Sequence, residues 1–264
     1  MSDKTETKAA SLGADKSPER VRTMFDQIAP KYDLLNDLLS LRLARLWRRK
    51  FAAKILSLLP EERAKSGSAE FLDAATGTGD LLVELRRQWR KRAKRGLVAG
   101  EFSGTGIDFS PRMLELAEKK FARAKISGLE LLEADGTALP FPDARFDAIS
   151  ISFGLRNMLD PARGIMEMAR VCRPGGVVAI LEFTRTRAPI FGSLFRFYFR
   201  NVLPAIGQAL AKNDKDAYRY LPQSVEEFDA PERILDHMRA AGLDRVEKRS
   251  MNFGVLASYC GIKK

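Results

Sequence analysis

The stretch Glu70-Phe-Leu-Asp-Ala-Ala-Thr-Gly-Thr-Gly-Asp-Leu81 decides the fold of this 264-residue chain. A short apolar run ends in small residues and two glycines and then passes into a second apolar segment, which predicts a strand, a tight turn and the start of a helix. Such a turn directs backbone N–H groups and the positive end of a helix toward a ligand above the sheet. A Cβ atom at Gly77 or Gly79 would fill the space that this ligand needs. The turn therefore predicts a site for an anionic group.

The spacing of the glycines narrows the class of ligand. A dinucleotide fingerprint needs a third Gly or Ala three residues after Gly79, and this position is Leu82. A pyrophosphate ligand is therefore disfavoured. The pattern Asp73-x-Ala75-x-Gly77-x-Gly79 resembles motif I of the class I S-adenosylmethionine-dependent methyltransferases, whose loop holds the carboxylate and amino group of the methionine moiety. Taken alone, the motif is equally compatible with a purely structural turn.

Composition sets the broad class of the protein. The net charge of +11 favours an acidic partner, such as nucleic acid, anionic lipid or an acidic protein. Cys172 and Cys260 lie far apart without metal-ligand spacing, so we expect neither a disulfide framework nor a metal site. We find no apolar signal segment at the N-terminus and no stretch with the ~20 apolar residues of a membrane span. We therefore expect a cytoplasmic protein.

The chain is long enough for one α/β domain with a full core. Residues 1–17 are polar and charged, which predicts a disordered tail, and residues 18–264 form the expected single domain. Residues 18–60 precede the first strand and carry helix signals, including Pro18 at a first helical position. Methyltransferases of the suspected fold often use such a segment as a lid, so we expect an N-terminal helical lid.

Strands alternate with helices in the central part of the chain. We predict strands at 105–109, 129–134, 146–152 and 177–183, and helices that begin at 110 and span 160–171 and 231–240. This alternation predicts a doubly wound parallel sheet, whose ligands bind outside the carboxyl ends of the strands. Four polar positions fall on that edge: Thr78, Asp108, Asp135 and Ser152.

Asp108 ends the second predicted strand. An acidic side chain at this place accepts hydrogen bonds from ribose hydroxyls in nucleotide-binding sheets, and a local cap for the next helix is the alternative. The spacing between Gly79 and Asp108 exceeds the usual ~20 residues. The basic segment 86–104 explains the excess if this segment loops out between the helix and the strand. The basic block 86–95 of that segment could contact phosphates, but a solvated helix end is favoured because this block contains no aromatic residue beyond Trp89 for stacking bases.

Several blocks of the sequence resemble the ubiquinone/menaquinone biosynthesis C-methyltransferase family over residues 21–263. The most specific are Ser152-Phe-Gly-Leu-Arg-Asn157 and Asn213-Asp-x-Asp-x-Tyr-Arg-Tyr-Leu221, and the blocks at 25–37 and 181–183 agree with them. The resemblance implies a Rossmann-like fold with a doubly wound, seven-stranded, mostly parallel sheet. It also implies transfer of a methyl group from S-adenosylmethionine to a ring carbon of a prenylated quinol.

The resemblance assigns cofactor contacts to the ends of the strands. They are Gly77, Thr78 and Gly79 at the methionine, Asp108 at the ribose, Asp135 and Gly136 at the adenine, and Ser152 near the cofactor below the substrate. The family more usually has Asn-Ala at the adenine pair. The carboxylate of Asp135 still accepts a hydrogen bond from the adenine amino group, so we expect binding to survive.

The predicted catalytic pair is Arg156 and Asn157. A quinol ring carbon becomes nucleophilic when its neighbouring hydroxyl loses a proton, so the site needs a base or an oxyanion stabiliser. An arginine can stabilise the phenolate, and an asparagine can orient a water that takes the proton; a structural loop clamp is the alternative. Tyr220, Asp214 and Asp216 are further candidates for orienting or deprotonating the ring.

Residues 190–225 are predicted to form a helical insertion on the substrate side. Within 189–210 a dense aromatic stripe is interrupted by Arg196 and Arg200. The stripe could line a tunnel for the prenyl tail, lie on the bilayer, or belong to a buried helix. A membrane-resident substrate and the positive charge favour reversible contact with an anionic membrane at its inner face. A homodimer is compatible with the sequence, and no nucleic acid is expected.

Other functions also fit parts of the sequence. Within the enzyme hypothesis, demethylmenaquinol is slightly favoured over 2-polyprenyl-6-methoxy-1,4-benzoquinol. An RNA-binding protein or RNA methyltransferase would explain the basic balance but not the aromatic stripe. A catalytically silent scaffold would have no reason to keep Thr78, Asp108, Arg156 and Asn157 together.

Overall fold

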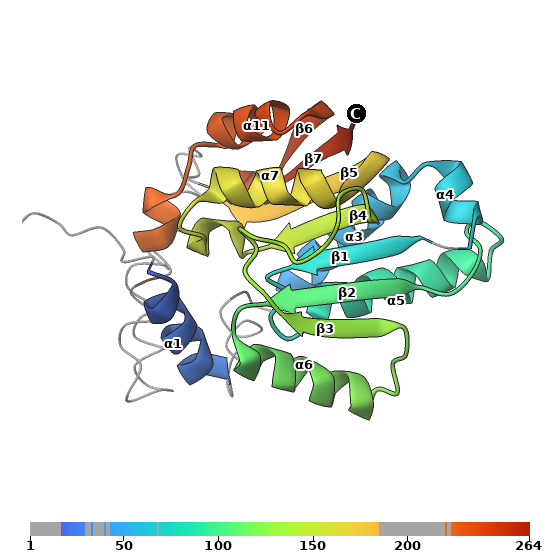
Figure 1. The fold of residues 1–264 in the computed structure, drawn as a ribbon, viewed down its shortest axis with the longest axis horizontal. Helices are drawn as coiled ribbons and strands as arrows, with labels where there is room; N and C mark the ends of the chain where they lie inside the picture. The colour runs from blue at the N-terminus through green and yellow to red at the C-terminus, as the bar shows by residue number, and fades with distance from the viewer. Residues whose placement is uncertain are drawn as a thin grey trace, which may run out of the picture.

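The computed structural model describes residues 17–29, 33, 40, 43–67, 69–184, 220 and 223–264. One seven-stranded sheet forms the centre, with helices on both faces (Figure 1). The strands are β1 (Glu70–Ala74), β2 (Ser103–Asp108), β3 (Leu129–Glu133), β4 (Phe146–Ser152), β5 (Cys172–Phe183), β6 (Leu243–Met251) and β7 (Leu256–Lys263). The α-helices are α1 (Pro18–Ile28), α3 (Leu43–Leu58), α4 (Glu61–Lys65), α5 (Asp80–Ala93), α6 (Pro111–Arg123), α7 (Pro161–Val171) and α11 (Pro231–Ala240), and short 3₁₀ turns are η2 (Leu155–Asn157) and η4 (Asn252–Gly254).

The strands follow the order β3-β2-β1-β4-β5-β7-β6. The first five strands pair in parallel, and β7 pairs antiparallel with both β5 and β6. The predicted seven-stranded, mostly parallel sheet is therefore confirmed. The chain winds outward from β1 to β3 and then returns to β4 on the other side of β1. In sheets of this kind the ligand binds at the carboxyl edge of this switch point.

The two faces of the sheet carry separate apolar layers. On one face α3 and α5 pack over Phe71, whose ring stacks on Phe102 with centroids 4.5 Å apart and meets Trp89 edge-on at 5.5 Å. On the other face α7 packs on β5, and α11 packs on α7, β6 and β7. Among the described helices before β1, α1 lies at the arrowhead ends of β2 and β3 (Figure 1), and α3 packs in the first layer with Trp47 against Phe153, just after β4.

The predicted strand limits hold to within two residues except at β5. This strand begins at Cys172 and not at the predicted position 177, so it includes residues 173–176. The register shifts between Phe146 and Ala148, whose partners are Cys172 and Val177. The buried Asp147 stabilises this irregularity, because its carboxylate accepts hydrogen bonds from Arg173 at 2.7 Å and from the backbone N–H of Glu70 at 2.9 Å.

Much of the basic segment 86–104 is helical, because α5 continues to Ala93. Beyond the helix the segment folds back, and the indole N–H of Trp89 donates to the Gly100 carbonyl at 3.2 Å. The Ala99 N–H donates to the Ala64 carbonyl of α4 at 2.8 Å. Among the described helices, none is long and apolar enough to cross a membrane.

Candidate functional site

The glycine loop joins β1 to α5 as the sequence predicts. Ala75, Gly77 and Gly79 all have positive φ angles, of 51°, 57° and 77°. Gly79 precedes the first helical residue, Asp80, and a Cβ atom at Gly79 would lie 2.5 Å from the Phe121 ring of α6. The turn therefore needs glycine at position 79 for its conformation and for close packing.

Asp108 links the loop to the next helix. Its two carboxylate oxygens accept hydrogen bonds from the backbone N–H groups of Gly77, at 2.8 Å, and Ser110, at 3.0 Å. The side chain of Ser110, not of Asp108, caps α6 by accepting from Met113 N–H at 3.2 Å. Each Asp108 oxygen keeps a second lone pair for a ribose hydroxyl. Burial raises the pKa of Asp108 to about 6.

A second buried carboxylate lies beneath the loop and was not among the predicted site residues. Asp73 accepts hydrogen bonds from the hydroxyls of Ser150, at 2.7 Å, and Thr76, at 2.8 Å. Burial raises the pKa of Asp73 to about 7 despite these bonds, and the charge of Asp108 adds to the increase. The sequence feature that could have identified Asp73 is an acidic residue inside an otherwise apolar strand.

Thr78 is buried at the centre of a polar network that the sequence did not reveal. Its hydroxyl donates to Asp33 at 2.7 Å and accepts from the Lys120 ammonium at 2.9 Å. Lys120 also contacts Asp33 at 2.8 Å and Asp80 at 2.6 Å, and Arg48 pairs with Asp80 at 2.7 Å. The network joins the N-terminal segment, the loop and α6, so protein contacts alone hold Thr78 in place.

Asp135 and Gly136 follow β3 at the same edge. The exposed Asp135 carboxylate accepts from the Thr137 N–H at 2.8 Å, which fixes the turn that carries the pair. A Cβ atom at Gly136 would lie 2.4 Å from the Met158 methyl carbon, so the backbone here packs closely against the segment after β4.

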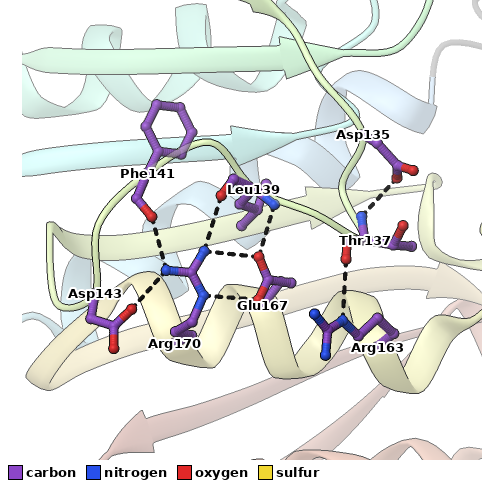
Figure 2. A network of polar contacts seen from close by, with 8 residues as sticks. All are labelled: Asp135, Thr137, Leu139, Phe141, Asp143, Arg163, Glu167 and Arg170. Atoms are coloured by element: carbon purple, nitrogen blue, oxygen red, sulfur yellow. Dashed lines mark hydrogen bonds and ion pairs between the residues drawn. The ribbon is translucent and has the colours of Figure 1, made fainter.

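A clamp on α7 holds the connection that follows this turn (Figure 2). The Arg170 guanidinium donates to the carbonyls of Phe141, at 2.8 Å, and Leu139, at 3.0 Å. It also pairs with Asp143 at 2.7 Å and with Glu167 at 2.8 Å, and Glu167 accepts from the Leu139 N–H at 2.8 Å. Arg163 adds one longer bond, of 3.4 Å, to the Thr137 carbonyl.

Arg156 lies in η2, just after β4, where it pairs with Glu182 of β5. The guanidinium donates to the Glu182 carboxylate at 2.8 Å and to the Phe153 carbonyl at 2.6 Å. Arg156 is 6% exposed and Glu182 is fully buried. The Asn157 amide also donates to Phe153, at 3.3 Å. These contacts agree with the alternative of a structural clamp, but they leave polar atoms of both side chains unused.

Within the described residues, the buried side-chain polar atoms that lack a hydrogen-bond partner gather around Phe153. They are Trp47 Nε1, Arg156 Nε, Asn157 Oδ1 and Tyr220 Oη. Trp47 meets the Phe153 ring at 6.3 Å, and Tyr220 interacts electrostatically with Arg156 and Glu182. Phe153 itself has a φ of 59°, a strained conformation for a bulky residue. We call these four residues with Phe153 the Phe153 cluster.

Tyr220 also lines a cavity of about 470 Å³ against α1. Burial raises its pKa, so the phenol is neutral and can orient a ligand but is a poor base. Ser152, the half-buried last residue of β4, lies just before the Phe153 cluster. The other two predicted substrate residues, Asp214 and Asp216, lie outside the described residues.

The sheet order, the glycine loop after β1 and the acid at the end of β2 define a class I S-adenosylmethionine-dependent methyltransferase. The fold resembles that of a SAM-dependent methyltransferase of Thermotoga maritima, with a TM-score of 0.59, 19% identity and coverage of 92% of this chain and 100% of the other. The ubiE/COQ5 methyltransferase family matches residues 14–263, and the chain belongs to this family.

Two relatives illustrate the match. The chain is 43% identical to the demethylmenaquinone methyltransferase of Deinococcus radiodurans, over 93% of each chain. It is 42% identical to the ubiquinone/menaquinone biosynthesis C-methyltransferase UbiE of Geobacter sp. (strain M21), over 93% of this chain and 97% of the relative. The predicted family and the predicted methyl donor, S-adenosylmethionine, are confirmed.

Proposed function

We propose that the enzyme methylates a ring carbon of a prenylated quinol, with demethylmenaquinol as the preferred acceptor and the methoxy-benzoquinol as the alternative. The observation that carries this proposal is the Phe153 cluster, in which buried donors and acceptors remain available at the carboxyl edge of the sheet. Buried polar groups are nearly always paired in native proteins, so a set without partners indicates a polar ligand. A quinol ring offers two hydroxyls of matching chemistry.

Three residues of the cluster each suit one requirement of the reaction. The cofactor supplies an electrophilic methyl group when it is bound. Arg156 is always cationic and can stabilise the phenolate that makes the ring carbon nucleophilic. Asn157 Oδ1 can accept a hydrogen bond from the water that removes the hydroxyl proton, and the neutral phenol of Tyr220 can donate to a ring oxygen. The ring carbon gains the methyl group and releases its hydrogen as a proton.

The cofactor residues named from the sequence fit this assignment. Asp108 keeps lone pairs for the ribose hydroxyls, and the positive φ angles of the glycine loop allow the close backbone approach that the methionine end needs. We also propose reversible contact with the inner face of an anionic membrane, because a prenyl tail keeps the acceptor in the bilayer and the net charge is +11. A homodimer stays a prediction.

Methyl transfer from labelled S-adenosylmethionine tests the proposal. The purified protein is offered short-tailed demethylmenaquinol and the methoxy-benzoquinol under reducing conditions. We expect label in the naphthoquinol, about tenfold or greater loss of rate in Arg156→Lys, and greater loss in Arg156→Ala, since a lysine keeps the charge but not the fork geometry. Label in the benzoquinol alone would show that the methoxy-benzoquinol, and not demethylmenaquinol, is the acceptor.

The control is Arg163→Lys, which alters an arginine of α7 away from the Phe153 cluster. Cofactor binding by each variant is measured in parallel, so that a folding defect is recognised. Label in neither quinol by a wild-type protein that still binds the cofactor would overturn the proposal in favour of an RNA substrate or a scaffold role.

A further inference from the structure

We infer that the first two turns of α3 form the surface that contacts an anionic bilayer. This α3 surface consists of Leu43, Arg45, Leu46, Arg49 and Lys50. The inference rests on the proposed function, because a prenylated acceptor brings the enzyme to the membrane. It adds the face of the molecule that meets the lipid.

The α3 surface is the outer side of an amphipathic helix. Ala44, Trp47 and Phe51 point into the core and are each at most 5% exposed. Leu43 and Leu46 lie on the other side and are 39% and 42% exposed. Two leucines three residues apart on the solvent side of a helix present a small apolar patch to whatever lies outside.

Cations surround this patch. Arg45, Arg49 and Lys50 are all exposed. Further along α3, Lys54 pairs with Glu247, and on the inner side Arg48 pairs with Asp80. Arg49 and Lys50 form no ion pair with the part of the chain that the structure describes. Leucines flanked by exposed cations match the interface of an anionic bilayer, where leucine enters the acyl boundary and cations meet phosphates.

The α3 surface lies at the same edge of the sheet as the Phe153 cluster. Trp47 contacts the rings of Phe153 and Phe183 at 6.3 Å and 6.5 Å, and Arg48 pairs with the first residue of α5 at 2.7 Å. The Arg156 guanidinium lies 5.4 Å from the centre of the Phe183 ring. A bilayer seated on these turns would therefore lie beside the residues proposed to bind the ring.

RNA fits this surface less well than lipid does. Sequence-tolerant RNA binding relies on exposed aromatic side chains that stack bases. The aromatic residues of α3, Trp47 and Phe51, are both buried in the core. The exposed apolar residues of the surface are leucines, which insert among acyl chains but offer no face to a base.

Vesicle co-sedimentation tests the inference on the full chain. Vesicles contain equal parts of phosphatidylcholine and phosphatidylglycerol, and pure phosphatidylcholine vesicles serve as the comparison. We expect binding to the anionic vesicles that falls about tenfold or more in Arg49→Glu/Lys50→Glu, since each basic residue near the surface contributes about 1 kcal/mol. Leu43→Ser/Leu46→Ser is expected to weaken binding without changing the charge.

The matched control is Arg90→Glu/Lys91→Glu at the exposed end of α5, which changes the net charge equally. Equal loss in this control, or unchanged binding by both α3 variants, would overturn the inference, because binding would then depend on net charge or on another face. Tighter binding to a single-stranded RNA oligonucleotide than to vesicles, lost in the α3 variants, would assign the surface to RNA.

Methyl transfer to a short-tailed quinol in detergent-free buffer separates this inference from the proposed function. The α3 variants are expected to keep the wild-type rate on this soluble acceptor, because none of the altered side chains belongs to the Phe153 cluster. Vesicle binding requires no turnover. Loss of vesicle binding by the variants therefore supports the α3 surface even where methyl transfer fails.

Discussion

At the scale of single residues, two buried carboxylates distinguish this carboxyl edge. Asp73 and Asp108 are each nearly fully buried, and burial raises the pKa of both, to about 7 and about 6. The hydrogen-bond partners of Asp108 in the described structure are backbone N–H groups, including those of Gly77 and Ser110, and none is a cation. Its ionisation state is therefore sensitive to pH in a range where enzymes are usually assayed.

We predict that affinity for S-adenosylmethionine falls as the pH falls through 6. A carboxylate accepts hydrogen bonds from ribose hydroxyls more strongly than a neutral carboxyl group does. Protonation of Asp108 below its pKa of about 6 removes the negative charge of this carboxylate. Isothermal titration calorimetry should show a dissociation constant about tenfold higher at pH 5 than at pH 7.5, the effect of about 1.4 kcal/mol. Asp108→Asn should bind weakly at both pH values, whereas the exposed-site control Asp236→Asn should follow wild type. An affinity that is independent of pH in wild type would contradict the assignment.

The sequence identifies several of these residues because the end of a parallel strand is a predictable place. Asp108, Ser152 and Arg156 follow apolar runs, so the local pattern of the chain is enough to predict their position at one edge. Their partners cannot be predicted in this way, because Glu182 meets Arg156 only through strand pairing and Lys120 meets Thr78 only through the packing of α6. The contacts that fix these side chains are long-range, and single-sequence patterns describe only local order.

At the scale of elements, short connections carry the predicted cofactor residues, and neighbouring helices hold them. The connection that follows Asp135 and Gly136 after β3 is fixed by α7, and the glycine loop is fixed by α6. A strand with a clear apolar run, such as β4, matches its predicted limits. The edge strand β6 was not located, because most of its residues are exposed and charged and it lacks an apolar alternation.

We predict that Arg170→Lys raises the KM for S-adenosylmethionine several-fold with little change in kcat. Lysine keeps the charge but cannot bridge the carbonyls of Phe141 and Leu139 together with Glu167, so the turn bearing Asp135 loosens. Steady-state kinetics measures KM and kcat separately and so checks this prediction. Arg163→Lys, which removes one bond of 3.4 Å, should change KM little. A fall in kcat alone for Arg170→Lys would argue against a positioning role.

We predict that Gly79→Ala destabilises the fold far more than Gly96→Ala. Both glycines have positive φ, of 77° and 68°, so alanine is strained at either position by about 1 kcal/mol. Only at Gly79 does the new methyl group also meet the Phe121 ring, whereas nothing lies within 4 Å at Gly96. Chemical denaturation should show an additional loss of about 1–3 kcal/mol for Gly79→Ala. Equal losses would mean that the loop and α6 move apart freely.

At the scale of the whole molecule, one sheet connects every described layer. The β6–β7 hairpin joins through β5, and α11 packs on both α7 and β6. A continuous sheet with a core on each face leaves no boundary at which part of the domain could separate. The single domain at 18–264 stays a prediction, which calorimetry checks: one transition is expected, with equal calorimetric and van't Hoff enthalpies. Two resolved transitions would contradict it.

We also predict that the unfolding free energy increases as the pH falls from 8 to 6. Asp73 has a pKa of about 7 when folded and an ordinary value near 3.8 when unfolded. In this range the folded state therefore binds a proton that the unfolded state does not bind. This difference stabilises the folded state at the lower pH, by about 1.4 kcal/mol for each pH unit below the folded pKa. Thermal melts should show a smaller pH effect in Asp73→Asn. An identical pH profile in that variant would exclude Asp73 as the source.

The position of β7 has a consequence for how the protein is made. β7 is an interior strand that completes the edge of β5, yet it follows β6 in the chain, and β6 reaches the sheet only through β7. While the polypeptide emerges from the ribosome, β5 therefore waits with an unpaired, apolar edge until the final hairpin has been synthesised. Such an edge invites pairing with another nascent chain. The chain order of these strands therefore leaves the apolar edge of β5 open to wrong pairing until the β6–β7 hairpin has formed.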